Sequence, residues 1–183
     1  MKQKIIFLIL LFTFLINAPM ALAQERASAS SAKILIAEQT VSDDYRVKVL
    51  YSYLKQYDSP LAPFAGDFVR NADKYNLDWK LVAAISGVES TYGEAIPFNS
   101  YNAWGWGVYG DNVIRFSSWK EGIETISQGL RERYINQWGG KDIYQIGAMY
   151  AASPTWAAHV ESTMDKIQEF ALRNPKDTLP LSL

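Results

Sequence analysis

The residue in this sequence best suited to chemistry is a single carboxylic acid, Glu89. It follows Ile85 by four residues and Val82 by seven, so a helix would carry all three on one inward face. Apolar surroundings disfavour the charged form of a carboxyl group, and so does the C-terminal end of a helix. A carboxyl that stays protonated near neutral pH can give its proton to a leaving oxygen. The alternative is that Glu89 forms a salt bridge or turns outward.

A strip of aromatic residues and glycines follows this acid. Residues 101–107 read Tyr-Asn-Ala-Trp-Gly-Trp-Gly. Aromatic faces stack on sugar rings, and glycines let a polymer approach the backbone closely. An acid beside such a strip is what cleavage of a glycosidic bond requires. The alternative is a loop packed down by its own aromatic side chains.

A second acid is not evident near Glu89. Glu94 is close to it in sequence, Asp111 lies at an expected turn, and Glu121 is explained as part of a helix cap. Most glycosidases use two carboxylates. A mechanism with one acid remains open, in which Glu89 acts as acid and then as base while a hydroxyl or acetamido group of the substrate replaces water.

Other chemistries find little support. The chain has no cysteine and one histidine, His159, which we expect at the surface of the last helix. There is no nucleophile-elbow motif, phosphate loop or dinucleotide fingerprint. We therefore predict neither a metal site nor a cofactor.

The elements that would position Glu89 are helices, because apolar residues recur at helical spacing from residue 43 onward. We expect helices ending before Ser59, over 61–75, from 79 to about 92, from 118 to the glycines at 139–140, over 141–151 and from 154 to 173. Residues 94–117 lack this spacing, and 109–116 suggest a short β-hairpin. The prediction is a mostly-α domain with a loop or hairpin insert after the helix that carries Glu89.

The N-terminal region indicates export. Lys2 and Lys4 precede an apolar run over 5–16, and Ala21-Leu22-Ala23 supplies a cleavage pattern, so we predict a signal peptide over 1–23. An uncleaved anchor is the alternative. A Ser/Ala-rich linker over 24–42, the domain over 43–174 and a tail over 175–183 complete the division.

The charge balance argues against a nucleic-acid partner. The whole chain has a net charge of −1, and removing residues 1–23 takes away two lysines and no acid, which leaves −3. Such a chain has no basic field to hold a phosphate backbone.

Three segments in order resemble the motifs of the bacterial glucosaminidase family: 89–93 (ESTYG), 101–106 (YNAWGW) and 116–119 (FSSW). That family has a lysozyme-like fold, which it shares with the soluble lytic transglycosylases. The resemblance is good over about 78–134, while 43–77 and 140–172 agree only in helical character. It implies a lysozyme-like domain for this chain.

The resemblance also implies roles for individual residues. Glu89 would be the general acid, and Tyr150 resembles a tyrosine that lytic transglycosylases carry close to that acid. The residues expected to bind substrate are Ser90, Tyr92, Asn102, Trp104 and Trp106. Trp156 is a further candidate for stacking on a sugar, although core packing explains Trp156 and Tyr150 equally well.

The expected function is therefore cleavage of peptidoglycan glycan strands by an exported, monomeric glycosidase of the endo-β-N-acetylglucosaminidase type. A lytic transglycosylase on the same scaffold is the first alternative. A non-catalytic module that binds the cell wall and a structural protein of the envelope are alternatives of another kind. The expected location is the periplasm, the cell wall or the medium, with no membrane contact after the signal is removed.

Overall fold

The computed structural model describes residues 44–107 and 112–174. The predicted signal peptide, linker and C-terminal tail lie outside these ranges, as does most of the expected turn at 110–112. In the described ranges no helix is both long and apolar enough to cross a bilayer.

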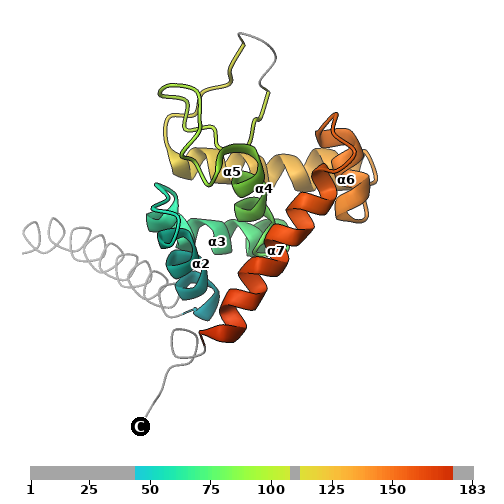
Figure 1. The fold of residues 1–183 in the computed structure, drawn as a ribbon. Coiled ribbons are helices and arrows are strands. Elements are labelled where there is room, and N and C mark those ends of the chain that lie inside the picture. The colour runs from blue at the N-terminus through green and yellow to red at the C-terminus, as the bar shows by residue number, and fades with distance from the viewer. Residues whose placement is uncertain (1–43, 108–111, 175–183) are drawn as a thin grey trace, which may run out of the picture. The chain divides into compact units, whose positions relative to one another are not determined.

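Six α-helices and two other helical segments make up the described chain, and it contains no strand (Figure 1). This confirms the mostly-α prediction and is consistent with an all-α, lysozyme-like domain. In order the segments are α2 (Tyr45–Lys55), the 3₁₀ helix η1 (Ala62–Phe64), α3 (Ala65–Tyr75), α4 (Leu81–Ser90), α5 (Trp119–Gly129), the π-helix η2 (Leu130–Gln137), α6 (Ile143–Tyr150) and α7 (Trp156–Arg173).

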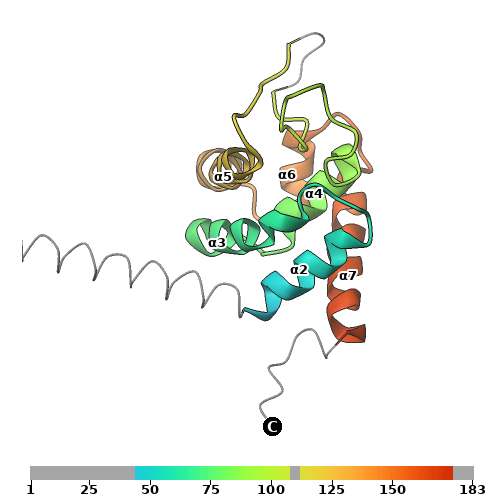
Figure 2. The ribbon, with the colours of Figure 1, turned by 90° about the vertical axis from the view of Figure 1, so that its left-hand side faces the viewer.

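Helix α4 packs against helices from both halves of the described chain. It contacts α3, α5 and, most extensively, α7, which also runs past α2 (Figure 2). Its first six residues, 81–86, are all buried. This fits the apolar composition of α4, because a helix that is apolar on most sides must be covered on most sides.

Helix ends follow the capping residues with small shifts. Asp78 accepts from the backbone N–H of Lys80 at 2.9 Å, but α4 begins at Leu81 and not at Trp79. Ser118 caps α5 as expected by accepting from the N–H of Glu121. The carboxylate of Glu121 reaches back one residue further than a capping box requires, to Ser117.

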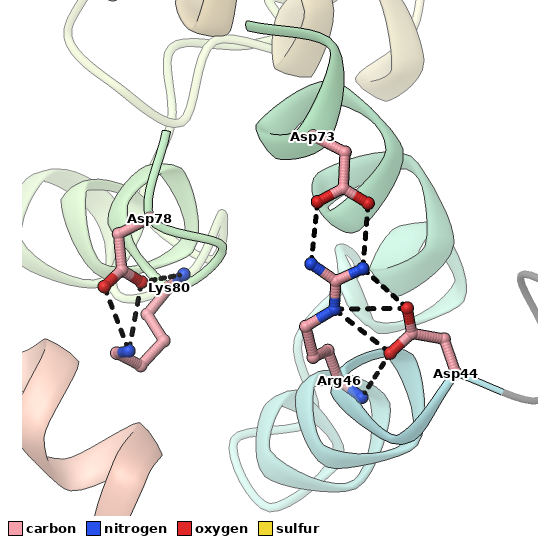
Figure 3. A network of polar contacts seen from close by, with 5 residues as sticks. All are labelled: Asp44, Arg46, Asp73, Asp78 and Lys80. Atoms are coloured by element: carbon pink, nitrogen blue, oxygen red, sulfur yellow. Dashed lines mark hydrogen bonds and ion pairs between the residues drawn. The ribbon is translucent and has the colours of Figure 1, made fainter. Parts of the chain in front are cut away.

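An ion-pair network joins the first helices (Figure 3). The Arg46 guanidinium binds Asp44, which precedes α2, at 2.6 Å and Asp73 of α3 at 2.7 Å. Figure 3 also shows the separate pair of Asp78 and Lys80 at the start of α4. These contacts fix α2 against α3 and hold the entry to α4.

The segment between α4 and α5 is irregular where the structure describes it. Its described residues form turns and irregular backbone with one isolated bridge residue, Asn112, and residues 109–111 of the predicted hairpin lie outside the described ranges, so the hairpin is not shown. One backbone hydrogen bond, from Phe116 N to Ser100 O at 2.9 Å, closes the base of the insert. Local backbone bonds, from Ala95 N to Ser90 O at 2.9 Å and from Ser100 N to Pro97 O at 3.0 Å, and bonds from the Asn102 side chain hold other backbone groups of the insert.

Candidate active site

Glu89 lies in the last turn of α4, where the helix emerges from the core. The residue is exposed, unlike Val82 and Ile85 on the same face, so the expectation of an inward-facing acid was only partly right. Its carboxyl group is nevertheless covered on two sides. Trp156 Nε1 donates to Oε1 at 2.6 Å, and a Cβ placed on Gly105 would lie 3.0 Å from Oε2. The acid therefore rests on the insert and on α7.

The surroundings of Glu89 favour its protonated form. Desolvation by the covering atoms raises the pKa of Glu89 above its ordinary value, and the hydrogen bond from Trp156 offsets part of the rise. Among the described residues no Lys, Arg or His lies within ion-pair distance of the carboxylate. The predicted salt-bridge alternative therefore finds no partner there.

The chain turns sharply directly after Glu89. Thr91, Tyr92 and Gly93 all have positive φ, at 51°, 58° and 91°. Thr91, and not Gly93, is the left-handed cap of α4. A left-handed backbone is costly for a β-branched residue, so the surrounding contacts must impose it.

Ser90 supplies one of those contacts. Its hydroxyl lies within hydrogen-bond distance of Ser86 O and of Ala103 O, at 3.0 and 2.8 Å, and accepts from Gly93 N at 2.9 Å. The residue is only 4% exposed. Ser90 thus ties the end of α4 to the insert and offers no surface for the substrate contact predicted from the sequence.

Tyr92 is also a structural residue. Its ring folds back over Gly87, where a Cβ would come within 2.5 Å of it, and its hydroxyl is 2.9 Å from that of Tyr53. Burial of the phenol is the main reason that the pKa of Tyr92 is raised to about 12. The side chain is 5% exposed, so the predicted contact with substrate is not available to it.

Asn102 organises the insert. Its amide nitrogen donates to Trp106 O at 2.8 Å and to Ile114 O at 2.9 Å, while its Oδ1 accepts from Trp106 N at 3.1 Å. Asn102 is 2% exposed. Its side chain holds both backbone polar groups of Trp106, so it positions that residue instead of contacting substrate directly.

Trp104 is a core residue. It is fully buried, and its Nε1 donates to Val82 O inside α4 at 2.9 Å. A Cβ on Gly122 would lie 2.7 Å from the ring, so α5 needs glycine there to admit it. The prediction that Trp104 binds sugar is corrected, because an indole enclosed on all sides anchors the insert to the core. Of the five predicted substrate residues only Trp106 is partly exposed.

Tyr150 and Trp156 complete the surroundings of Glu89. Their rings stack with centroids 4.7 Å apart, and the Tyr150 hydroxyl donates to Trp104 O at 2.7 Å. Burial of the hydroxyl, followed by the negative charge of Glu89, raises the pKa of Tyr150 well above its ordinary value. Tyr150 therefore lies near the acid as a neutral phenol. Trp156 is 4% exposed, and its role as hydrogen-bond donor to Glu89 was missed because the two residues are 67 positions apart.

None of the remaining candidates within the described residues forms a hydrogen bond or ion pair with Glu89. Glu94 and His159 are exposed, and Glu121 is bound to Ser117. Asp111 lies outside the described residues. Across 44–107 and 112–174 no three His, Cys, Asp or Glu side chains gather in a way that could hold a metal ion. No second carboxylate is identified as a base.

Two cavities lined by described residues do not include Glu89 in their walls. One, of about 870 Å³, lies between the start of α4, η2, α6 and α7. The other, of about 320 Å³, lies beside Trp106 at the junction of α5 and η2. No protein-family model matches the chain, and no curated protein matches it either. The case for function therefore depends on the geometry around Glu89.

Proposed function

We propose that this protein cleaves the glycan strands of peptidoglycan, with Glu89 as the general acid. The observation that carries the proposal is the state of that carboxyl group: partly desolvated, raised in pKa, free of a basic partner among the described residues and still open to solvent on one side. An acid in this state can protonate a glycosidic oxygen.

Trp156 determines which oxygen would deliver the proton. An indole N–H is only a donor, so Oε1 must present a lone pair to it. When Glu89 is protonated, the proton therefore belongs on Oε2, beside Gly105. The absence of a side chain at Gly105 leaves room for a leaving group to approach that oxygen.

We take Glu89 to act as the only carboxylate in the reaction, because no other described carboxylate contributes to the shift of its pKa. With one carboxylate, Glu89 protonates the leaving oxygen and then accepts a proton from the group that attacks the anomeric carbon. Attack by water gives a hydrolase, for which we propose the N-acetylglucosaminidase type, and attack by a hydroxyl of the substrate gives a lytic transglycosylase. The neutral Tyr150 phenol nearby would contribute a dipole and not a charge.

The test compares wild type with Glu89→Gln on purified sacculi, with mass analysis of the soluble products. We expect wild type to release muropeptides and the variant to release almost none, because removal of a general acid costs about 10²- to 10⁴-fold in rate. Reducing ends would identify a hydrolase and anhydro ends a transglycosylase. Equal release by both proteins would refute the proposal. A wall-binding module instead predicts that both bind sacculi and neither releases fragments.

A further inference from the structure

The smaller cavity, of about 320 Å³, has one aromatic and several polar walls. Trp106 forms the aromatic wall, and Gln128, Glu132 and Arg133 are among the polar residues that line it. All three polar residues are exposed, and Trp106 is partly exposed. An indole bordered by hydrogen-bonding groups is a surface suited to a sugar ring, which has apolar C–H faces and a polar rim.

The Trp106 ring is held rigidly in this wall. Asn102 binds both of its backbone polar groups. The ring lies so close to the end of α5 that a Cβ on Gly129 would be 2.6 Å from it. A fixed aromatic surface loses little conformational entropy when a ligand binds.

The helix below the cavity changes type at the same place. Directly after Gly129 the chain winds as a π-helix from Leu130 to Gln137. Such segments are rare and occur often at functional sites. The π-helix carries Glu132 and Arg133 to the cavity wall, next to Gln128 of α5.

The polar side chains that line the cavity differ in the partners that they have within the protein. Gln128 Nε2 donates to both carboxylate oxygens of Glu132 at 3.0 Å. The Arg133 guanidinium lies 5.9 Å from the ring centroids of Trp106 and Trp138, and within the described chain no carboxylate is in ion-pair distance of it. Arginine presents a planar fork of donors that matches a carboxylate.

From these contacts we propose that the cavity binds a hexosamine that carries a carboxylate, with its ring on Trp106 and its carboxylate on Arg133. This inference rests on the proposed function in taking peptidoglycan as the polymer, because its muramic acid units carry a lactyl carboxylate. That group is free in denuded strands, whereas in strands with stem peptides the carboxylates belong to the peptide. Neutral polymers of N-acetylglucosamine lack both.

The cavity is connected to Glu89 by a row of aromatic rings. Trp156 binds the acid, Tyr150 stacks on Trp156, and the centroid of the Trp106 ring lies 6.1 Å from that of Tyr150. Gly105, next to Trp106, faces the same carboxyl group, since a Cβ placed on it would lie 3.0 Å from Oε2. A strand bound on Trp106 would thus extend toward the acid, which makes the cavity a subsite that selects charged strands.

The test measures binding in the Glu89→Gln background, so that strands are not consumed. Dissociation constants are determined for denuded strands, for strands with stem peptides and for neutral N-acetylglucosamine oligomers of equal length. Arg133→Gln should weaken binding of denuded strands about tenfold, the loss expected for one charge-assisted hydrogen bond, and leave the neutral oligomers within about twofold. A comparable loss on peptide-bearing strands alone would assign the carboxylate to the stem. Arg173→Gln, an exposed arginine at the far end of α7, is the matched control.

The outcomes separate this inference from the proposed function. The subsite is refuted if Arg133→Gln leaves the preference for charged strands unchanged or weakens the binding of charged and neutral strands equally. It is also refuted if the parent protein binds none of the polymers. If wild type cleaves no sacculi but Arg133→Gln abolishes the preference, the subsite holds and the proposed enzyme does not. Trp106→Ala should weaken charged and neutral polymers alike, because stacking does not depend on charge.

Discussion

The two ends of α4 present opposite kinds of polar site. At the start of the helix, Lys80 pairs with Asp78 at 3.0 Å, and this pair borders the larger cavity, of about 870 Å³. Arg131 in the same wall donates to the carbonyls of Tyr75 and Asn76. At the other end, about 12 Å away at 1.5 Å per residue, Glu89 has one neutral donor and no cation among the described residues.

This difference indicates where chemistry is to be expected. A carboxylate beside a cation is stabilised in its ionised form, which holds no proton to donate to a leaving group. One that is partly desolvated without a cation keeps its proton more readily, as the raised pKa of Glu89 shows.

The largest effect should come from replacing Glu89, and the comparison replaces an acid in the cavity at the other end of α4. Glu89→Gln should lower the rate of glycan cleavage about 10²- to 10⁴-fold, because it removes the transferable proton. Asp165→Asn, which alters an exposed acid in the wall of the larger cavity, should change the rate by less than about twofold. Release of dye-labelled fragments from sacculi measures both. A large loss with Asp165→Asn would place the chemistry at the wrong end.

The next effect concerns stability and tests whether Trp104 is structural. Trp104→Ala should lower the free energy of unfolding by about 3–5 kcal/mol, as expected for a fully buried tryptophan. Trp138→Ala, at a residue 47% exposed, should cost less than about 1 kcal/mol. Denaturant titration followed by circular dichroism measures both. Equal costs would show that Trp104 is not enclosed as described.

These assignments also show what could be predicted from the sequence. The helices followed from apolar spacing and from caps such as Ser118, which act over a few residues. Glu89 could be selected because its position depends on the helix that carries it. The roles of Ser90, Asn102 and Trp104 could not be separated from substrate binding. Polar and aromatic residues in a loop serve either purpose, and only closure of the insert on α4 decides between them.

Two further features had no local signal. Pairing of Trp156 with Glu89 requires α7 to lie against α4, a contact between segments 67 residues apart in sequence. The π-helix after Gly129 replaces α-helical bonds while Leu130 and Tyr134, four residues apart, are both buried, so the apolar spacing gives no sign of it.

A smaller effect is expected from the hydrogen bond that steadies Glu89. Trp156→Phe removes an N–H that opposes the rise in pKa, so the pKa of Glu89 should increase further. Glu89 must be protonated to act, so activity falls as the pH rises through its pKa. In Trp156→Phe this fall in the pH–activity profile should therefore occur at higher pH. Trp79→Phe, which changes a tryptophan before the other end of α4, should not change the pH at which activity falls. A fall in activity that occurs at lower pH in Trp156→Phe would contradict the assigned role of Trp156.

The smallest effect should appear in the dependence of stability on pH. A carboxyl whose pKa is raised by folding stabilises the folded state below its ordinary pKa of 4.5, and this contribution is lost as pH rises through the folded value. Glu89→Gln has no carboxyl group to ionise at this position and therefore avoids that loss of stability. At pH 7 its melting temperature should be higher than that of wild type, and the difference should disappear below about pH 4. Glu94→Gln controls for removal of one charge at the same turn. A variant less stable than wild type at pH 7 would mean that the ionised Glu89 stabilises the fold. The contrast between the two ends would then be lost.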